Sequence, residues 1–229
     1  MLFLGIDTAT VRGSIALADG KLTECEVQLE ARAWHARDLL EQIDGMLMRA
    51  GHAPSDLNGI GVAVGPGSFT GVRIGMATGK GMAYALGIGL AGLSTLEALA
   101  LAARFERKES SGRLCPIIEA GRGEVYFAEF ECEADGVRRL SPDRSRPPHA
   151  LDTDSSGALT LVGSGAGLVM QADETIRRRA TVIDPAPSLA GAIARWAAGR
   201  IMPERGYEAG TLNPNYVRPS DAETTRRRR

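Results

Sequence analysis

Apolar residues in the first fifty positions follow two different periods. Runs at 2–7, 13–19 and 21–30 are apolar or alternate with polar residues, as β-strands do, and Asp19–Gly20 is a typical tight turn between the last two. From 36 to 50 the apolar residues instead recur every three or four positions, up to a glycine that can cap a helix. The pattern predicts a meander of three strands followed by an amphipathic helix.

The same order of elements occurs a second time along the chain. After a strand at 59–64, a helix at 70–86, a strand at 88–93 and a helix from about Thr95, strands are predicted at 114–120, 124–131, 136–140 and 159–163, and helices at 167–179 and 189–198. We therefore expect an α/β fold with two similar lobes, each a mixed sheet flanked by helices. The expected division is a first lobe at 1–105, a second, smaller lobe at 112–205 and a C-terminal tail at 206–229.

The helix predicted at 70–86 carries small residues at every fourth position. We call this set, Gly71, Gly75, Gly79 and Ala83, the glycine strip. Each glycine costs a helix interior about 1 kcal/mol relative to alanine, so some other part of a protein must approach the strip closely. The first helix or the sheet of the same chain would explain the strip as well as a helix of a partner subunit would.

An irregular turn at Gly65-Pro66-Gly67 precedes this helix. Ser68 or Thr70 can accept a hydrogen bond from a free N–H group of the helix that begins there. Such a helix start can also attract an anion.

Common catalytic motifs are missing from the sequence. No serine has the two glycines of a GxSxG motif, no HExxH is present, and the three cysteines form no CxxC. We therefore expect no catalytic residue and no metal site. One alternative stays open, because Asp7 at the end of the first strand and Thr8 in the next turn could hold a metal-bound phosphate as well as cap the turn.

Composition limits the class of protein further. With 229 residues, 44% of them hydrophobic, the chain can bury one large core or two small ones. The last four residues are all arginine, so the rest of the chain is more acidic than the formal net charge of -1 and is a poor binder of nucleic acid by itself. No apolar run is long enough to span a membrane and no signal peptide is recognisable, so we expect a cytoplasmic protein.

Four stretches resemble the TsaB (YeaZ) family: LGIDTAT near the start, GPGSFTGVRIG from Gly65 to Gly75, GEVYFAEF in the second half, and PNYVR near the end. The resemblance implies two ribonuclease-H-like lobes of the actin, sugar kinase and Hsp70 ATPase superfamily. It also implies a non-catalytic scaffold subunit that dimerises with the catalytic paralogue TsaD, is joined by TsaE, and supports N6-threonylcarbamoylation of the adenosine 3′ to the anticodon in tRNAs reading ANN codons.

The resemblance also carries expectations about sites and partners. It implies no cofactor of the chain's own, a homodimer when the chain is alone, and contact with tRNA only through the complex, and it leaves open a nucleotide at the TsaB–TsaD junction. The expected partner-binding residues are His35, Leu39, Ile43, Gly65, Pro66, Gly67, Ser68, Phe69, Thr70, Gly71, Arg73, Gly75, Gly79 and Met82, and the expected nucleotide-binding residues are Asp7 and Thr8. The alternative is a nucleotide-dependent transferase or an M22-type peptidase in its own right.

Overall fold

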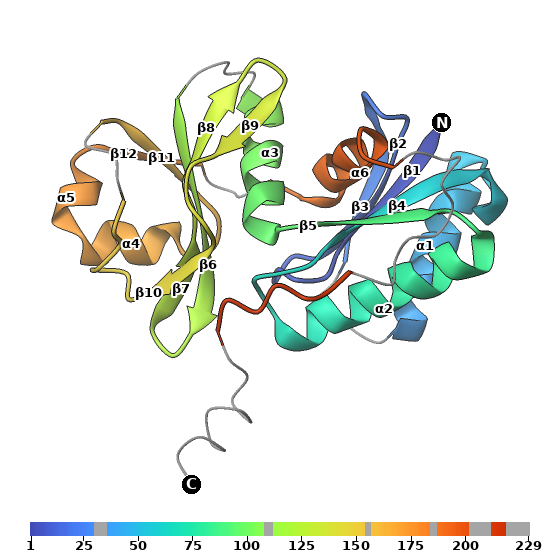
Figure 1. Ribbon diagram of the computed structural model, residues 1–229, viewed down its shortest axis with the longest axis horizontal. Helices are drawn as coiled ribbons and strands as arrows, with labels where there is room; N and C mark the ends of the chain where they lie inside the picture. The colour runs from blue at the N-terminus through green and yellow to red at the C-terminus, as the bar shows by residue number, and fades with distance from the viewer. Residues whose placement is uncertain (30–35, 108–111, 154–156, 184–186, 202–211, 219–229) are drawn as a thin grey trace, which may run out of the picture.

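The computed structural model describes residues 1–29, 36–107, 112–153, 157–183, 187–201 and 212–218, and it consists of two α/β lobes that lie side by side (Figure 1). This is the predicted α/β fold class, with two lobes that each contain a mixed sheet flanked by helices. Within the described residues, the sheet of the first lobe has the strand order β3-β2-β1-β4-β5. The sheet of the second lobe has the path β10-β7-β6-β11-β12, with β8 paired to β6 and β9 paired to β8.

The first lobe begins with the predicted meander. β1 (Leu2–Asp7), β2 (Ser14–Ala18) and β3 (Thr23–Gln28) pair antiparallel, and β4 (Leu57–Ala63) and β5 (Gly89–Leu93) extend the sheet in parallel from β1. The helices α1 (Ala36–Ala50) and α2 (Phe69–Leu86) pack on one face of this sheet, and a short 3-10 helix (Pro54–Asp56) precedes β4. The strands and helices predicted for this half are confirmed, with ends that differ by one or two residues.

The second lobe contains β6 (Arg113–Gly121), β7 (Glu124–Phe127), β8 (Phe130–Glu133), β9 (Gly136–Arg139), β10 (Arg144–Arg146), β11 (Leu159–Val162) and β12 (Ala180–Ile183). The run predicted as one strand at 124–131 is two strands, which pair with different parts of β6. The helix predicted at 167–179 is also divided, into α4 (Ala166–Ala172) and α5 (Glu174–Arg177), because the side chain of Asp173 caps a new helix by accepting from the Ile176 N–H. Sequence analysis missed β10 and β12, which are short.

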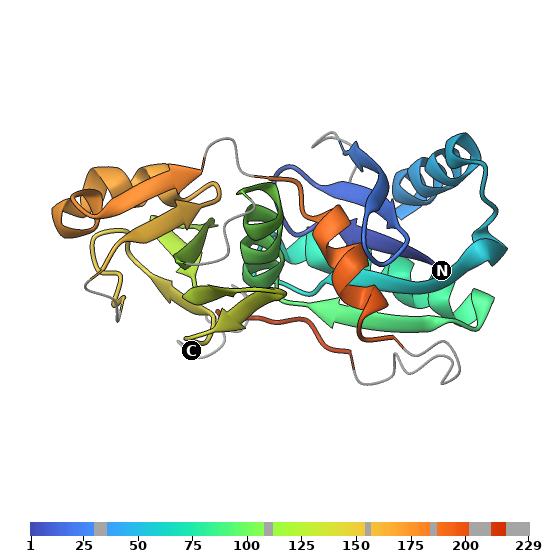
Figure 2. The same ribbon diagram turned by 90° about the horizontal axis from the view of Figure 1, so that it is seen from above.

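Two helices cross the division that the sequence suggested. α6 (Ala190–Ala198), expected in the lobe at 112–205, packs on the first sheet, on the face opposite α1 and α2 (Figure 2). α3 (Thr95–Arg107), expected in the lobe at 1–105, packs mainly on β6 and β9 of the second sheet. The packing therefore differs from the predicted domain boundaries at these two helices.

The close approach of α6 has a cause in the sheet itself. Gly5 and Gly61 lie on the strands that α6 crosses, and a Cβ atom on Gly61 would lie only 2.8 Å from a methyl group of Ile193. A Cβ atom on Gly5 would overlap the carbonyl oxygen of Ala190. The helix, rich in alanine, thus packs with its backbone close to the sheet, and the strand glycines decide which sheet receives it.

The glycine strip is buried inside its own protomer, which corrects the expectation that Gly71, Gly75 and Gly79 contact a partner. A Cβ atom on Gly71 would overlap the carbonyl oxygen of Thr8, and one on Gly79 would lie 2.7 Å from a methyl group of Val62. The strip therefore brings α2 down onto β1 and β4. Of the two explanations that the sequence left open, the structure shows internal packing.

Two substitutions in the same helix test this role of the strip. Gly71→Ala should lower the free energy of unfolding by about 1–3 kcal/mol, because the new methyl group meets backbone that cannot move aside. Gly81→Ala is the matched control, since a Cβ atom there meets nothing within 4 Å, and it should raise stability by about 1 kcal/mol. Urea unfolding followed by circular dichroism measures both, and equal effects of the two substitutions would contradict the packing role.

Candidate functional site

The outward side of α1 and α2 (Figure 1) exposes apolar residues among polar ones such as Glu41, Gln42 and Asp44. We call it the outer α1–α2 face and define it by Leu40, Met48, Ala77, Gly81 and Tyr84, all of which are exposed. Met48 is 72% exposed and Tyr84 is 76% exposed. Isolated exposed apolar residues are ordinary, but large ones beside small ones on two adjacent helices form a surface that another helix can pack against.

The structure separates the predicted partner-binding residues into three groups. Leu39 and Ile43 are buried between α1 and the sheet. Gly65, Pro66 and the glycines of the strip are buried as well. All of these residues are therefore corrected from contact residues to buried residues of the protomer. Ser68, Phe69, Thr70 and Arg73 are exposed at the start of α2, and Gly67 and Met82 are half-buried. His35 lies outside the described residues.

The turn before α2 is fixed to the turn after β1. As predicted, Ser68 caps the helix, because its Oγ accepts from the Gly71 N–H at 3.1 Å. The Ser68 N–H in turn donates to the carbonyl oxygen of Ala9 at 2.8 Å, and the Thr8 hydroxyl donates to the carbonyl oxygen of Gly71 at 2.7 Å. The two turns therefore form one hydrogen-bonded unit.

Asp7 and Thr8, the expected nucleotide-binding residues, point into this unit and do not line the space between the lobes. The carboxylate of Asp7 is fully buried and accepts from the N–H groups of Ala9 and Thr10 and from the Thr10 hydroxyl. Burial raises the pKa of Asp7 from its ordinary value of 3.8 to about 6, in spite of these hydrogen bonds. The two residues act here as the cap of a turn, which is the structural alternative that the sequence had left open.

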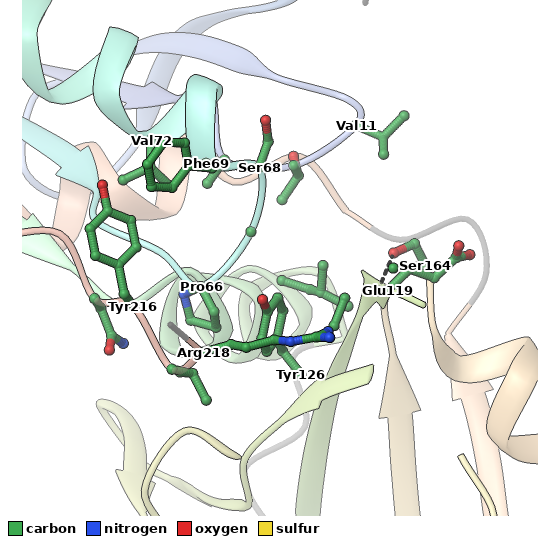
Figure 3. Close-up of a pocket in the computed structure, with 18 of the residues that line it drawn as sticks. Val11, Pro66, Ser68, Phe69, Val72, Glu119, Tyr126, Ser164, Tyr216 and Arg218 are labelled. Atoms are coloured by element: carbon green, nitrogen blue, oxygen red, sulfur yellow. Dashed lines mark hydrogen bonds between the residues drawn. The ribbon is translucent and has the colours of Figure 1, made fainter. Parts of the chain in front are cut away.

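A cleft of about 960 Å³ separates the two lobes at this point (Figure 3). Its first-lobe wall is the turn from Pro66 to Phe69 with Arg73, and its second-lobe wall includes residues 118–122, Tyr126 and Ser164. Residues 215–218 form the third wall. The carboxyl group of Glu119 lies beside Ser164, whose Oγ accepts from the Glu119 N–H at 3.2 Å.

Cationic and aromatic side chains dominate the mouth of the cleft. The guanidinium of Arg73 lies 3.7 Å from the ring centre of Phe69, and its Nε donates to the hydroxyl of Tyr216 at 2.9 Å. Arg218 pairs with Glu124 at 3.3 Å. Such a surface can bind planar or anionic groups, and the described lining holds no histidine or cysteine.

The described part of the chain contains neither a cluster of metal-binding side chains nor a helix that could span a membrane. Among those residues, no group of three or more histidine, cysteine, aspartate or glutamate side chains is placed to hold a metal ion. No helix of that same part combines the length and the apolar character that a membrane span requires.

Sequence reasoning missed residues of both surfaces. Tyr216 and Arg218 enter the sequence analysis only as part of the PNYVR motif, because nothing in a short polar segment indicates that it reaches the cleft. Met48 and Tyr84 are not among the expected contact residues, because the glycine strip directs the prediction to the buried side of α2. The sequence does contain a signal for them, since large apolar residues on the polar side of an amphipathic helix are unusual.

The raised pKa of Asp7 predicts a pH dependence of stability. The folded protein holds the Asp7 proton more tightly than the unfolded chain does, so this stabilisation is complete below about pH 4 and is lost as the pH rises through 6. The free energy of unfolding should therefore fall by about 3 kcal/mol across this range relative to that of Asp7→Asn, which keeps the shape of the side chain. Urea unfolding of both proteins between pH 4 and 7 measures the difference, and parallel curves would refute it.

Comparison with known proteins places the chain among relatives. The family model described as TsaD, tRNA N6-adenosine threonylcarbamoyltransferase, matches residues 29–144. The tRNA threonylcarbamoyladenosine biosynthesis protein TsaB of Escherichia coli is 36% identical over 137 residues, which are 60% of this chain and 58% of that protein. An uncharacterized protein of Mycobacterium tuberculosis is 31% identical over 96% of this chain and 92% of its own length.

Solved structures agree over nearly the whole length. YeaZ from Pseudomonas aeruginosa has a TM-score of 0.79 at 27% identity and covers 94% of this chain and 99% of its own. Component A of (R)-2-hydroxyglutaryl-CoA dehydratase from Acidaminococcus fermentans shares the fold alone. Its TM-score is 0.51 at 11% identity, and the match covers 87% of this chain and 98% of that one. The sequence alignments to the TsaB proteins of Escherichia coli and Bacillus subtilis span less than two thirds of those relatives, 58% and 62%. By these matches in sequence and structure, the chain belongs to the TsaB (YeaZ) family, within the wider family that the TsaD model describes.

Proposed function

We propose that this chain is a non-catalytic subunit in tRNA threonylcarbamoyladenosine biosynthesis, and that it pairs with a catalytic protein of the TsaD family. In that complex the catalytic partner transfers threonylcarbamoyl to N6 of the adenosine 3′ to the anticodon in tRNAs reading ANN codons. The observation that carries the proposal is the outer α1–α2 face, where Leu40, Met48 and Tyr84 are exposed on a helix pair whose inward side is already packed. The relatives named as tRNA threonylcarbamoyladenosine biosynthesis proteins indicate the pathway.

The shape of this face favours a helix pair as its partner. Ala77 and Gly81 on α2 have at most a methyl group, so a second helix can approach closely, and Met48 on α1 and Tyr84 farther along α2 add exposed apolar area. The TsaD family model matches residues 29–144, a range that includes α1 and α2. A TsaD-family protein would therefore present a related helix pair, and two such pairs can pack as a four-helix bundle.

The same reasoning extends to the other expected partners. Without a TsaD-family protein, the outer α1–α2 face would pack on its own copy, which gives a homodimer with the same helices in contact. In the proposal TsaE joins the heterodimer, tRNA is held by the complex, and the cationic cleft with Arg73 at its mouth leaves room for a nucleotide near the subunit junction.

The absence of catalysis by this chain is part of the proposal. Its support is the environment of Asp7, whose carboxylate accepts hydrogen bonds from the turn that it caps, and the lack of histidine and cysteine in the described lining of the cleft. Turnover of ATP, or cleavage of a peptide, by the isolated chain would contradict this part and favour the alternative of an enzyme in its own right.

Charge placed on the outer α1–α2 face should prevent pairing. Met48→Glu and Ala77→Glu should each weaken binding to the TsaD paralogue of the same genome by at least about thirty-fold, because the contact would have to bury an unpaired carboxylate. Isothermal titration measures the affinity, and the thermal unfolding midpoint should stay near that of the unmodified chain, since both positions are exposed.

The matched control is Leu168→Glu, which places the same charge on an exposed leucine of α4 in the second lobe. It should leave the affinity unchanged. Reconstitution with the TsaD and TsaE proteins and the enzyme that supplies the threonylcarbamoyl donor, followed by mass spectrometry of tRNA nucleosides, should show loss of the modified base only with the α1 and α2 variants. Full affinity of those variants would overturn the placement of the interface.

A further inference from the structure

The described residues near the C-terminus form an extended segment that reaches both lobes. We call Leu212–Arg218 the strap. It runs past β5 and α2 of the first lobe and continues to β7 of the second lobe (Figure 1). Figure 2 shows the strap on one side of α3 and the segment that leads into α6 on the other side. The strap therefore connects the two lobes on the side of α3 opposite the segment that enters α6.

The strap is fixed to the first lobe by its backbone. The Asn215 N–H donates to the carbonyl oxygen of Val64 at 2.7 Å, and Lys80 donates to the carbonyl oxygen of Leu212 at 2.8 Å. A Cβ atom on Gly92 would overlap the side chain of Leu212, so a glycine of β5 makes room for the strap. These two hydrogen bonds to backbone carbonyl groups and the contact between Leu212 and Gly92 make the strap an integral part of the fold.

Asp143 fastens the strap to the second lobe. Its Oδ2 accepts from Asn215 Nδ2 at 2.6 Å and from the Ser94 hydroxyl at 2.7 Å, and its Oδ1 accepts from Arg139. The Asp143 side chain is only 6% exposed. One nearly buried carboxylate thus joins the strap, the residue before α3 and the end of β9, and charge-assisted hydrogen bonds of this kind are among the stronger ones. Arg218 adds an ion pair with Glu124.

The middle of the strap forms a wall of the cleft. The ring of Tyr216 stacks on that of Phe69 with 5.2 Å between ring centres, and its hydroxyl accepts from Arg73. Figure 3 places Tyr216 and Arg218 on the side of the cleft opposite Ser164 and Glu119. Movement of the strap would therefore change both the width of the cleft and the position of the aromatic side chains at its mouth.

We propose that the strap sets the relative position of the two lobes, that the contact between Asn215 and Asp143 is its fastening, and that its release opens the cleft. This inference does not depend on the proposed function, because it concerns the isolated chain.

Distance measurement between the lobes tests the proposal. Spin labels on Lys21→Cys in the first lobe and Gln171→Cys on α4 in the second occupy exposed positions, and Cys25→Ser removes the one half-buried thiol, since the other two cysteines are buried. Electron double resonance on the full chain gives the distribution of distances. Asn215→Asp sets two carboxylates against each other, so the distribution should broaden and its mean should become longer.

A reciprocal exchange distinguishes fastening from general damage to the fold. When Asn215→Asp is combined with Asp143→Asn, the amide at 143 can donate to the carboxylate at 215 while its oxygen still accepts from Arg139 and the Ser94 hydroxyl rotates to accept. The double variant should restore the narrow distribution. An unchanged distribution in Asn215→Asp, or a double variant as broad as the single one, would overturn the proposal.

Truncation gives an independent measurement. A chain that ends at residue 211 lacks the strap and should show the same broad distribution, whereas the matched control, a chain that ends at Arg218, should behave like the full chain. If the shorter chain shows the narrow distribution, the proposal is wrong. If it does not fold, the strap is part of the core, and the substitutions at Asn215 and Asp143 decide the question alone.

Discussion

The close approach of α2 to the first sheet determines the arrangement of both candidate surfaces. Because Gly71 and Gly75 carry no side chain, the first turns of α2 lie against Thr8, and the turn before α2 is hydrogen-bonded to the turn after β1. That contact buries the carboxylate of Asp7, directs the start of α2 toward the cleft, and leaves the remaining side of the helix exposed. A larger residue at Gly71 would displace all three features together.

The order of strands and helices could be predicted from the sequence, since it depends on local periodicity and on turns such as Asp19–Gly20. The sequence could not show which side of α2 is buried in the protomer and which side is exposed. A strip of glycines indicates that something lies close, but spacing along one chain is the same whether the neighbour is its own sheet or another subunit. Only the facing atoms decide, and for Gly79 these are the side chains of Val62 and Leu90 in the same sheet.

The positions of α3 and α6 were beyond sequence reasoning for a related reason. From the order of elements along the chain, each helix is predicted to belong to the lobe whose strands are next to it in sequence. Its packing depends instead on complementary shape between elements that are far apart in sequence. The complement of α6 is a pair of glycines in β1 and β4, Gly5 and Gly61, which in a strand pattern look only like weak positions. The strap is similar, since Leu212 is read as part of a polar tail until Gly92 is seen beneath it.

Burial of Asp7 has a consequence for where function can lie. A carboxylate at the end of the first strand could assist chemistry in the cleft only if it faced that space, and three hydrogen bonds from its own turn hold it inward. The cleft carries arginine and aromatic side chains together with Glu119 and Ser164, and it is bounded by a strap held through a nearly buried aspartate. Leu40, Met48 and Tyr84 are exposed on α1 and α2. The same packing that directs the Asp7 carboxylate away from the cleft leaves the outer side of that helix pair accessible, in agreement with the association that we propose for it.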